Sequence, residues 1–248
     1  METPFIKDGE RLDDLQLEGL YIIQKINGFR FGIDAVLLSN YAKAGMNDKV
    51  IDLGTGTGII PLLLSAKTKA SRIVGIEIQK DMAEMAARSV KYNKLQDKIE
   101  IVEGDFLEAT RIFGYNSFDV VVTNPPYTKA GGGLLNPEDI KAIARHEIHC
   151  TLEQLISVSS KLLKGNGRFF MIHKPERLVD IFYYMRLNSI EPKSIRLVHP
   201  SFGKGANLVL IYGLKNGNPQ VTIEEPLYLY QEDGSGQLKQ QITKHKML

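Results

Sequence analysis

Strand-like and helix-like patterns alternate along most of this 248-residue chain, and this alternation limits the possible folds more than any other feature. Strands that are connected through helices form a mostly parallel sheet with right-handed crossovers. The expected strands are residues 49–53, 72–78, 98–103, 118–123, 168–173, 194–199 and 207–214, and the expected helices are about 58–67, 80–94, 151–163 and 175–188. Residues 200–206 are too few for a helical crossover, so the last two strands should be antiparallel. The sequence therefore predicts an α/β fold: a seven-stranded, mostly parallel sheet with the last strand antiparallel and helices on both faces.

A short hairpin and a helix precede this alternation. Residues 20–24 are apolar enough for a strand, and the Asn27-Gly28 pair predicts a turn into residues 29–31. Asp34 is expected to cap a helix over residues 35–42. These elements form an N-terminal part of the chain that packs on the main domain.

Two further stretches lie outside the alternation. Residues 128–150 are a Gly-rich insertion, and long loops within compact domains commonly serve as lids. The chain becomes polar and Gly-rich after Lys215, although residues 227–230 could form a small strand. We therefore expect an N-terminal part over residues 1–45, a main domain over 46–215 and a polar C-terminal extension over 216–248.

Composition restricts the class of protein. There are 31 Lys and Arg residues against 29 Asp and Glu, so any contact with nucleic acid has to come from a local basic face. The single cysteine, Cys150, excludes an intrachain disulfide and is typical of a reducing compartment. No apolar run is long enough to cross a membrane, and the opening residues lack a signal peptide. We expect a cytoplasmic protein that has no membrane contact.

The segment VIDLGTGTG, residues 50–58, predicts a cofactor site. Its three glycines, Gly54, Gly56 and Gly58, connect a strand to a helix, and glycine is needed where backbone approaches a ligand or takes a positive φ. A dinucleotide-binding loop has its third glycine three positions after the second, where this chain has Ile59, so the spacing disfavours NAD. Glu77 ends the next strand, where a carboxylate can accept both hydroxyls of a ribose.

Acidic and aromatic residues after the third strand extend this site. Asp105 lies at the same edge of the predicted sheet, where it can accept a hydrogen bond from an adenine amine, and Phe106 can pack on the ring. A Gly-Asp pair is also common in ordinary turns. Glycine loop, Glu77 and Asp105 together predict a cofactor that contains a nucleoside.

The segment TNPPY, residues 123–127, predicts a second site at the same edge. Asn124 ends an apolar strand, and proline at the next two positions fixes an extended backbone and removes two N–H donors. The loop is therefore stiff and rich in acceptors. Ligands of open α/β sheets bind at this edge, so we expect the loop to hold a group that donates hydrogen bonds.

These motifs resemble those of the Rossmann-like S-adenosylmethionine-dependent methyltransferases. The resemblance rests on residues 52–58, Glu77, Asp105 and residues 124–127, and it implies S-adenosylmethionine as the cofactor. An Asn-Pro-Pro-Tyr loop implies methylation of a nitrogen attached to a planar system, either adenine N6 or the amide of glutamine. The segments at 29–42, 144–147 and 199–215 are similar to bacterial tRNA adenine-N6 methyltransferases that modify the adenosine just 3′ of the anticodon of a valine tRNA.

The resemblance also implies roles for single residues. Asn124 and the Pro125 carbonyl would accept the two N–H bonds of the target amine, Pro126 would stiffen the loop, and Tyr127 would stack on the base. The implied cofactor contacts are Phe31, Gly32, Asp34, Asp52, Gly54, Thr55, Gly56, Glu77, Ile78, Asp105, Phe106 and Asn124. The implied substrate or lid contacts are Lys129, Arg145, His146 and Lys204. Core packing is an equal alternative for Phe31.

Other functions remain open at this point. A glutamine N5-methyltransferase of the release-factor type uses the same tetrapeptide, but the chain has only a hairpin and a helix before the glycine loop. An rRNA base N-methyltransferase and a catalytically silent RNA-binding module are further alternatives. Residues 145–150, RHEIHC, lack a second ligand pair at zinc spacing, so no metal is expected. The oligomeric state is open, with a monomer preferred.

Overall fold

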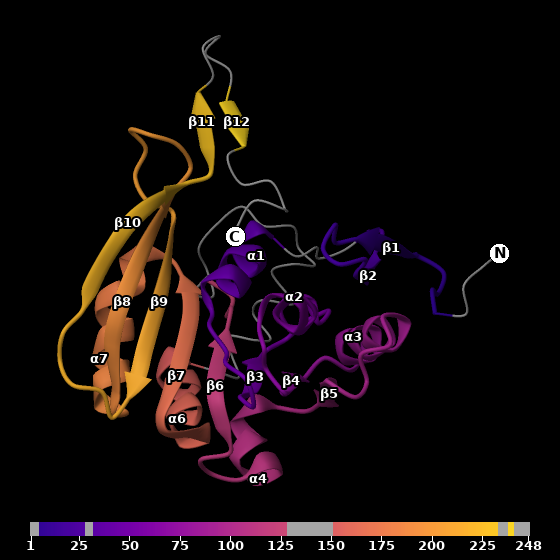
Figure 1. Ribbon diagram of the computed structural model, residues 1–248, viewed down its shortest axis with the longest axis horizontal. Coiled ribbons are helices and arrows are strands. Elements are labelled where there is room, and N and C mark those ends of the chain that lie inside the picture. Colours follow the sequence, from indigo (N-terminus) through magenta and orange to yellow (C-terminus); the bar gives the residue numbers. More distant parts are fainter. Residues whose placement is uncertain (1–4, 28–31, 128–150, 233–237, 241–248) are drawn as a thin grey trace.

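A central eight-stranded sheet organises the computed structural model, which describes residues 5–27, 32–127, 151–232 and 238–240 (Figure 1). Its strand order is β10-β8-β9-β7-β6-β3-β4-β5. The strands are β3 Lys49–Leu53, β4 Arg72–Glu77, β5 Ile99–Glu103, β6 Phe118–Thr123, β7 Leu163–His173, β8 Ile190–His199, β9 Leu208–Lys215 and β10 Thr222–Tyr228. Strand β9 is antiparallel to both its neighbours, whereas every other adjacent pair is parallel. The predicted α/β class and the reversed β9 are confirmed.

The predicted number of strands is wrong, because the sheet has eight strands and not seven. The additional strand, β10, lies at the edge of the sheet and pairs in parallel with β8. Its sequence, TIEEPLY, contains two glutamates and a proline. Such residues are tolerated at a sheet edge but do not give the apolar pattern of a buried strand.

Helices cover both faces of the sheet, as the alternation predicts. They are α1 Ile33–Tyr41, α2 Ile59–Lys67, α3 Lys80–Tyr92, α4 Ala109–Phe113, α6 Leu152–Leu162 and α7 Leu178–Leu187, with 3-10 turns at Phe106–Glu108 and Pro175–Arg177. Side chains alternate between the two faces of a strand. Along β6, Val120 and Val122 therefore join the core beneath α1 and α2, whereas Val121 joins the core beneath α6 and α7.

The N-terminal hairpin differs from the prediction. Strand β2, Tyr21–Lys25, pairs with the upstream strand β1, Glu10–Asp14, and residues 28–31 lie outside the described residues. Backbone N–H groups of Tyr21 and Ile23 donate to Asn93 and to Ser89 of α3, which fixes the hairpin against that helix. Strand β1 was not predicted because its charged sequence, ERLDD, lacks the apolar pattern of a strand.

The start of α1 also corrects a prediction. Gly32, with an extended backbone, occupies the N-cap position, and the helix begins at Ile33, before Asp34. The Asp34 carboxylate accepts from the adjacent Ala35 N–H but does not cap the helix. Strands β11 Tyr230–Glu232 and β12 Leu238–Gln240 form a small separate sheet after β10.

Candidate active site

Parallel strands bring the motifs to one edge of the sheet. Strands β5, β4, β3, β6 and β7 are parallel neighbours, so their carboxyl ends lie side by side (Figure 1). The buried Thr123 hydroxyl donates to the Leu53 carbonyl at 3.0 Å and joins the end of β6 to the end of β3. The glycine loop and the Asn-Pro-Pro-Tyr loop therefore begin at adjacent points.

The glycine loop folds over the end of β4. Backbone N–H groups of Gly54 and Thr55 both donate to the Ile76 carbonyl at 3.0 Å. Gly54 and Gly56 have φ of +76° and +57°, and a Cβ added at either would meet no atom within 4 Å. Backbone conformation and not packing thus requires glycine here, and the space beside the loop is open to a ligand.

Glu77 is held against the glycine loop from the end of β4. Its side chain is buried, and its Oε2 accepts from Gly56 N–H while its Oε1 accepts from Gln79 N–H, both at 2.9 Å. The residue is therefore fixed in place at the end of β4, beside the glycine loop.

Asp52 is buried just before the same loop. Neither of its carboxylate oxygens, nor the buried Thr55 hydroxyl, has a hydrogen-bond partner among the described residues. Burial raises the pKa of Asp52 to about 7, the nearby Thr55 hydroxyl partly opposes this increase, and the negative charge of Glu77 adds to it. Buried polar groups are normally paired, so the unpaired carboxylate is consistent with a site that a ligand or water completes.

Asp105 and Phe106, which follow β5, stabilise the local structure at the carboxyl edge of the sheet. Asp105 caps the 3-10 turn by accepting from Leu107 N–H at 2.9 Å, and Gly104 N–H donates to the Glu77 carbonyl. Phe106 packs partly against the core beneath α4 and α6. Ile78, next to Glu77, is 46% exposed.

Tyr127 joins the Asn-Pro-Pro-Tyr loop to α1. Its hydroxyl donates to Asn124 Oδ1 at 2.7 Å and to Asp34 Oδ2 at 2.9 Å, so the two acceptors share a single proton. Burial, together with the charge of Asp34, raises the pKa of Tyr127 well above its ordinary value, so the hydroxyl keeps its proton. Asp34, expected at the cofactor, is thus connected to the Asn-Pro-Pro-Tyr loop.

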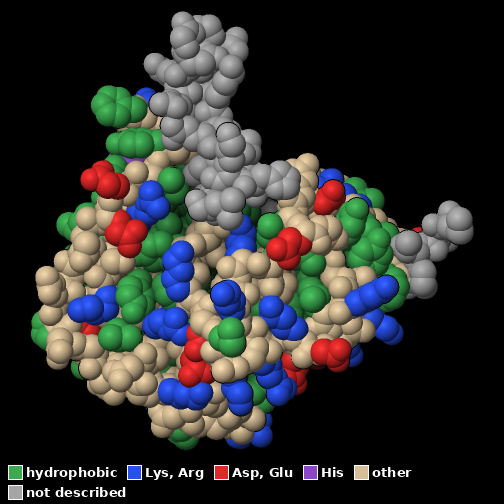
Figure 2. All heavy atoms as spheres, in the orientation of Figure 1, with side chains coloured by type: hydrophobic (Ala, Val, Ile, Leu, Met, Phe, Trp, Pro, Cys, Tyr) green, Lys and Arg blue, Asp and Glu red, His purple; other side chains and the backbone are tan. Residues whose placement is uncertain are grey.

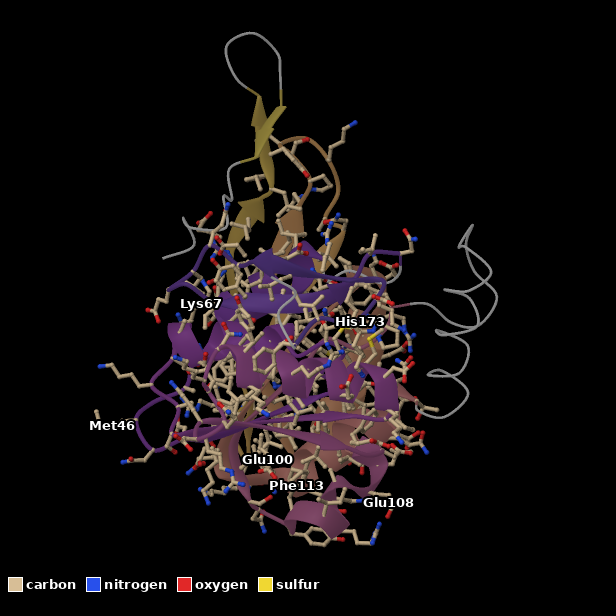
Figure 3. All side chains as sticks on the ribbon, turned by 90° about the vertical axis from the view of Figure 1, so that its right-hand side faces the viewer. Met46, Lys67, Glu100, Glu108, Phe113 and His173 are labelled. Carbon is tan, nitrogen blue, oxygen red and sulfur yellow. The ribbon has the colours of Figure 1, made fainter. Side chains whose placement is uncertain are left out.

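His173 and Lys174 complete this part of the site, although sequence analysis missed both. The His173 ring packs edge-on against Tyr127 at a centroid distance of 5.4 Å, and Lys174 Nζ lies 5.4 Å above the Tyr127 ring. Lys174 N–H donates to His173 Nδ1, and burial lowers the pKa of His173 to about 4, so the ring is neutral at pH 7. In Figure 3, His173 lies at about mid-height of the molecule, above Glu100 and Phe113, which lie toward its lower end. The position of His173 and Lys174 at the carboxyl end of the buried strand β7 was the available signal in the sequence.

Several residues that were expected to contact the cofactor or the substrate are not placed beside the glycine loop or the Asn-Pro-Pro-Tyr loop. Phe31, Lys129, Arg145 and His146 lie outside the described residues. Lys204 lies in the β8–β9 loop, at the same edge as Asn124 but with β7 and β9 between the two strands concerned. Within the described ranges there is no group of three His, Cys, Asp or Glu side chains that could hold a metal, and no helix there has the length and apolarity to cross a membrane.

Strand β9 is reversed and lies between two strands that are parallel to each other, and the glycine loop and the Asn-Pro-Pro-Tyr loop follow strands β3 and β6 in the other half of the sheet. This is the architecture of the Rossmann-like S-adenosylmethionine-dependent methyltransferases. The chain belongs to the methyltransferase small domain family, whose model matches residues 32–180.

Curated relatives and solved structures agree with this class. The chain is 36% identical over 161 residues to tRNA1(Val) (adenine(37)-N6)-methyltransferase of Porphyromonas gingivalis, and this match spans 62% of each chain. It is 27% identical over 205 residues to the protein of the same name from Dyadobacter fermentans, which covers 81% of this chain and 82% of the relative. A structure described as a predicted O-methyltransferase from Agrobacterium tumefaciens has a TM-score of 0.65 at 24% identity and covers 83% of this chain and 91% of its own. Geranyl diphosphate C-methyltransferase from Streptomyces coelicolor has a TM-score of 0.55 at 16% identity, with 73% and 76% covered. These two structures support the fold.

Proposed function

We propose that the protein transfers a methyl group from S-adenosylmethionine to N6 of an adenine in tRNA, at the adenosine just 3′ of the anticodon of a valine tRNA. The observation that carries the proposal is the stiff loop of residues 124–127 beside the glycine loop, in a chain similar to proteins named for this reaction. A tRNA substrate would place the reaction in the cytoplasm.

The residues at the glycine loop suit S-adenosylmethionine. Glu77 would accept the ribose hydroxyls, Gly54 and Gly56 leave open space beside the backbone, and Asp105 with Phe106 would hold the adenine. The unpaired Asp52 carboxylate supplies acceptors for polar hydrogens nearby. When bound, S-adenosylmethionine supplies a methyl group activated by its sulfonium.

The substrate loop would act on the amine of adenine. This amine is a weak nucleophile because its lone pair is delocalised into the ring. Asn124 Oδ1 and the Pro125 carbonyl would accept its two N–H bonds and favour a pyramidal nitrogen with an available lone pair. Tyr127 already donates to Asn124 Oδ1, which orients the amide oxygen before a substrate arrives. That oxygen has a second lone pair for the amine.

Tyr127 would also position the target base. An enzyme that modifies a base has to take it out of the stack, and an aromatic ring can hold the extruded base. The His173 and Tyr127 rings pack in a T-shaped arrangement, and Lys174 lies over one face of the Tyr127 ring. The base would therefore stack on the other face. Positioning of this kind contributes about 7–11 kcal/mol in well-oriented reactions.

The first test is transfer of a labelled methyl group from S-adenosylmethionine to unmodified tRNA, followed by digestion to nucleosides and identification by mass. We expect N6-methyladenosine, and mapping of the label should place it next to the anticodon of valine tRNA. Methylation of a protein glutamine or of rRNA, with no transfer to tRNA, would overturn the proposed substrate.

The variant Asn124→Ala tests the role of the loop. Removal of one transition-state acceptor should lower kcat by about 10²–10³-fold and leave cofactor affinity nearly unchanged. Single-turnover kinetics and calorimetry with S-adenosylhomocysteine measure the two quantities. Asn218→Ala, at an exposed asparagine in the loop before β10, is the matched control and should change neither. An equal loss of kcat and cofactor affinity in Asn124→Ala would contradict the role.

A further inference from the structure

An exposed aromatic cluster lies at the carboxyl ends of β8 and β10, away from the residues discussed above. We call it the aromatic corner, and it consists of His199, Phe202 and Tyr228. Phe202 is 87% exposed, its ring centroid lies 6.0 Å from that of Tyr228, and the His199 ring lies 5.4 Å from Tyr228. Figure 2 shows hydrophobic side chains that protrude at the upper left, above the β8–β9–β10 part of the sheet.

The backbone holds the aromatic corner in place. Lys204 N–H donates to the Ser201 carbonyl and closes a four-residue turn in which Gly203 has φ +76°, so Phe202 is directed outward. His199 Nδ1 donates to the Lys204 carbonyl at 2.7 Å, because a carbonyl can only accept. Leu229 and Tyr230 N–H groups donate to the carbonyls of His199 and Pro200 and bind the loop to the end of β10.

The aromatic corner lies at the same edge of the sheet as the substrate loop. Strands β6, β7, β8 and β10 run in one direction, so residues 173, 199 and 228, which end their strands, and residue 124, which follows β6, all lie at this edge. Two strands separate β6 from β8, which corresponds to about 14 Å at a spacing of roughly 4.8 Å per strand. A flexible strand of nucleic acid could contact both places at once.

The loop that carries Phe202 has one cationic side chain. Residues 197–208 and 226–230 contain Lys204 and no Asp or Glu, although Glu224 and Glu225 directly precede the second segment. Exposed rings beside a cation are the means by which proteins bind unpaired nucleotides, because every base has a face that can stack. We propose that the aromatic corner stacks unpaired nucleotides of the RNA substrate that flank the target base, while Lys204 faces their phosphates. This inference rests on the proposed RNA substrate.

A tryptophan at position 202 gives a direct test, because the chain contains no other tryptophan. The fluorescence of Phe202→Trp should be quenched when an unmodified anticodon stem-loop RNA is added, since stacking on a base quenches indole emission. Tyr183→Trp is the matched control, because Tyr183 is an aromatic residue 63% exposed on α7. Quenching of the control to the same degree, or no quenching at position 202, would overturn the inference.

Two substitutions separate stacking from general apolar contact. Phe202→Ala should weaken binding of the stem-loop RNA by roughly 5- to 150-fold, the effect of losing one stacked base, with cofactor affinity unchanged. Phe202→Leu keeps an apolar side chain but loses the ring, so it should bind nearly as weakly as Phe202→Ala. Full RNA affinity in Phe202→Leu would overturn stacking and indicate a general apolar contact with the RNA.

The same measurements distinguish this inference from the proposed methylation. Suppose that the wild-type protein methylates tRNA, that the fluorescence of Phe202→Trp is not quenched and that Phe202→Ala keeps its KM for tRNA. RNA stacking at the aromatic corner would then be refuted, and the proposed methylation would be supported. If Phe202→Trp is quenched by RNA but no methyl group reaches tRNA, the aromatic corner binds RNA and the proposed reaction fails.

Discussion

The fold changes the protonation equilibrium of a single residue, Asp52. Its carboxylate is fully buried, has no partner among the described residues, and has a pKa raised by burial to about 7. A carboxyl group with a raised folded-state pKa binds its proton more tightly in the native state than in the unfolded chain. Stability from this group is therefore complete below the unfolded pKa and is lost as pH rises through the folded pKa.

The variant Asp52→Asn tests this directly. The contribution of Asp52 to the free energy of unfolding should fall between about pH 4 and pH 7, by at most about 4 kcal/mol, whereas His173, whose pKa is lowered to about 4, contributes in the opposite direction below about pH 6.5. The amide of the variant cannot ionise, so the stability of the variant relative to the wild type should increase from pH 5 to pH 8. Urea denaturation at pH 5 and pH 8 measures the difference.

Asp119→Asn is the control for this experiment. Burial opposes ionisation of Asp119, but hydrogen bonds from Lys164 and from the Lys49 N–H outweigh it and lower the pKa of this carboxyl. Its contribution to stability is therefore lost only as pH falls through the acidic range. This variant should lose stability without changing the slope between pH 5 and pH 8. If Asp52→Asn keeps the wild-type slope, Asp52 is not the group that titrates.

At the scale of elements, Gly58 determines how closely two helices approach. It precedes α2 with φ of +83°, and a Cβ built there would lie 3.0 Å from the Cβ of Ala86 in α3. Two separate requirements therefore favour glycine: a left-handed backbone and close packing. The other two glycines of the loop have open space beside them, so only Gly58 carries the second requirement.

A double-mutant cycle separates the two requirements. Gly58→Ala should destabilise the protein by about 1–2 kcal/mol for the left-handed conformation, and by more because of the contact with Ala86. Ala86→Gly should cost about 1 kcal/mol through helix propensity. The double variant should be less destabilised than the sum of the single variants, because the contact is relieved. Additive values from thermal or urea unfolding would show that the contact adds nothing.

Strand β10 shows why an element can be missed. Glu224 accepts from Ser194 of β8 at 2.7 Å and from the Tyr41 hydroxyl of α1 at 3.0 Å. In the sequence, Glu224 is typical of a solvated tail. In the structure, its hydrogen bonds join β10 to β8 and to α1. Burial raises the pKa of Tyr41, so it remains a donor in this network.

At the scale of the whole molecule, a cofactor that binds only the native state should stabilise the entire fold. S-adenosylhomocysteine at one hundred times its Kd would add about 2.7 kcal/mol to the free energy of unfolding. The increase in Tm should largely disappear in Glu77→Gln, which changes the carboxylate held against the glycine loop. Glu103→Gln, at the exposed end of the neighbouring β5, should retain it. A full Tm increase in Glu77→Gln would contradict the ribose assignment.

Local pattern determined much of the fold and of the cofactor half of the site. Most buried strands and the longer helices were predicted within a few residues because their apolar periodicity is intrinsic to the segment. Strands β7 and β8 begin five and four residues earlier than predicted, and the short helix α4 was not predicted. The three glycines of the loop and the paired prolines were informative because their backbone restrictions do not depend on distant residues. Glu77 and Asp105 could be placed at one edge because parallel strands align their carboxyl ends.

Tertiary structure alone decided the remaining features. The Tyr127 hydroxyl reaches Asp34 across 93 positions of sequence, and His173 and Lys174 meet Tyr127 because β7 lies beside β6. Strand β1 became the hairpin partner, and β10 joined the sheet, through contacts that their polar sequences do not predict. The sequence thus determined the buried strands, the longer helices and the stiff loops, because those preferences are local. Pairing of edge strands and the meeting of side chains depend on distant neighbours, so only the folded molecule settles them.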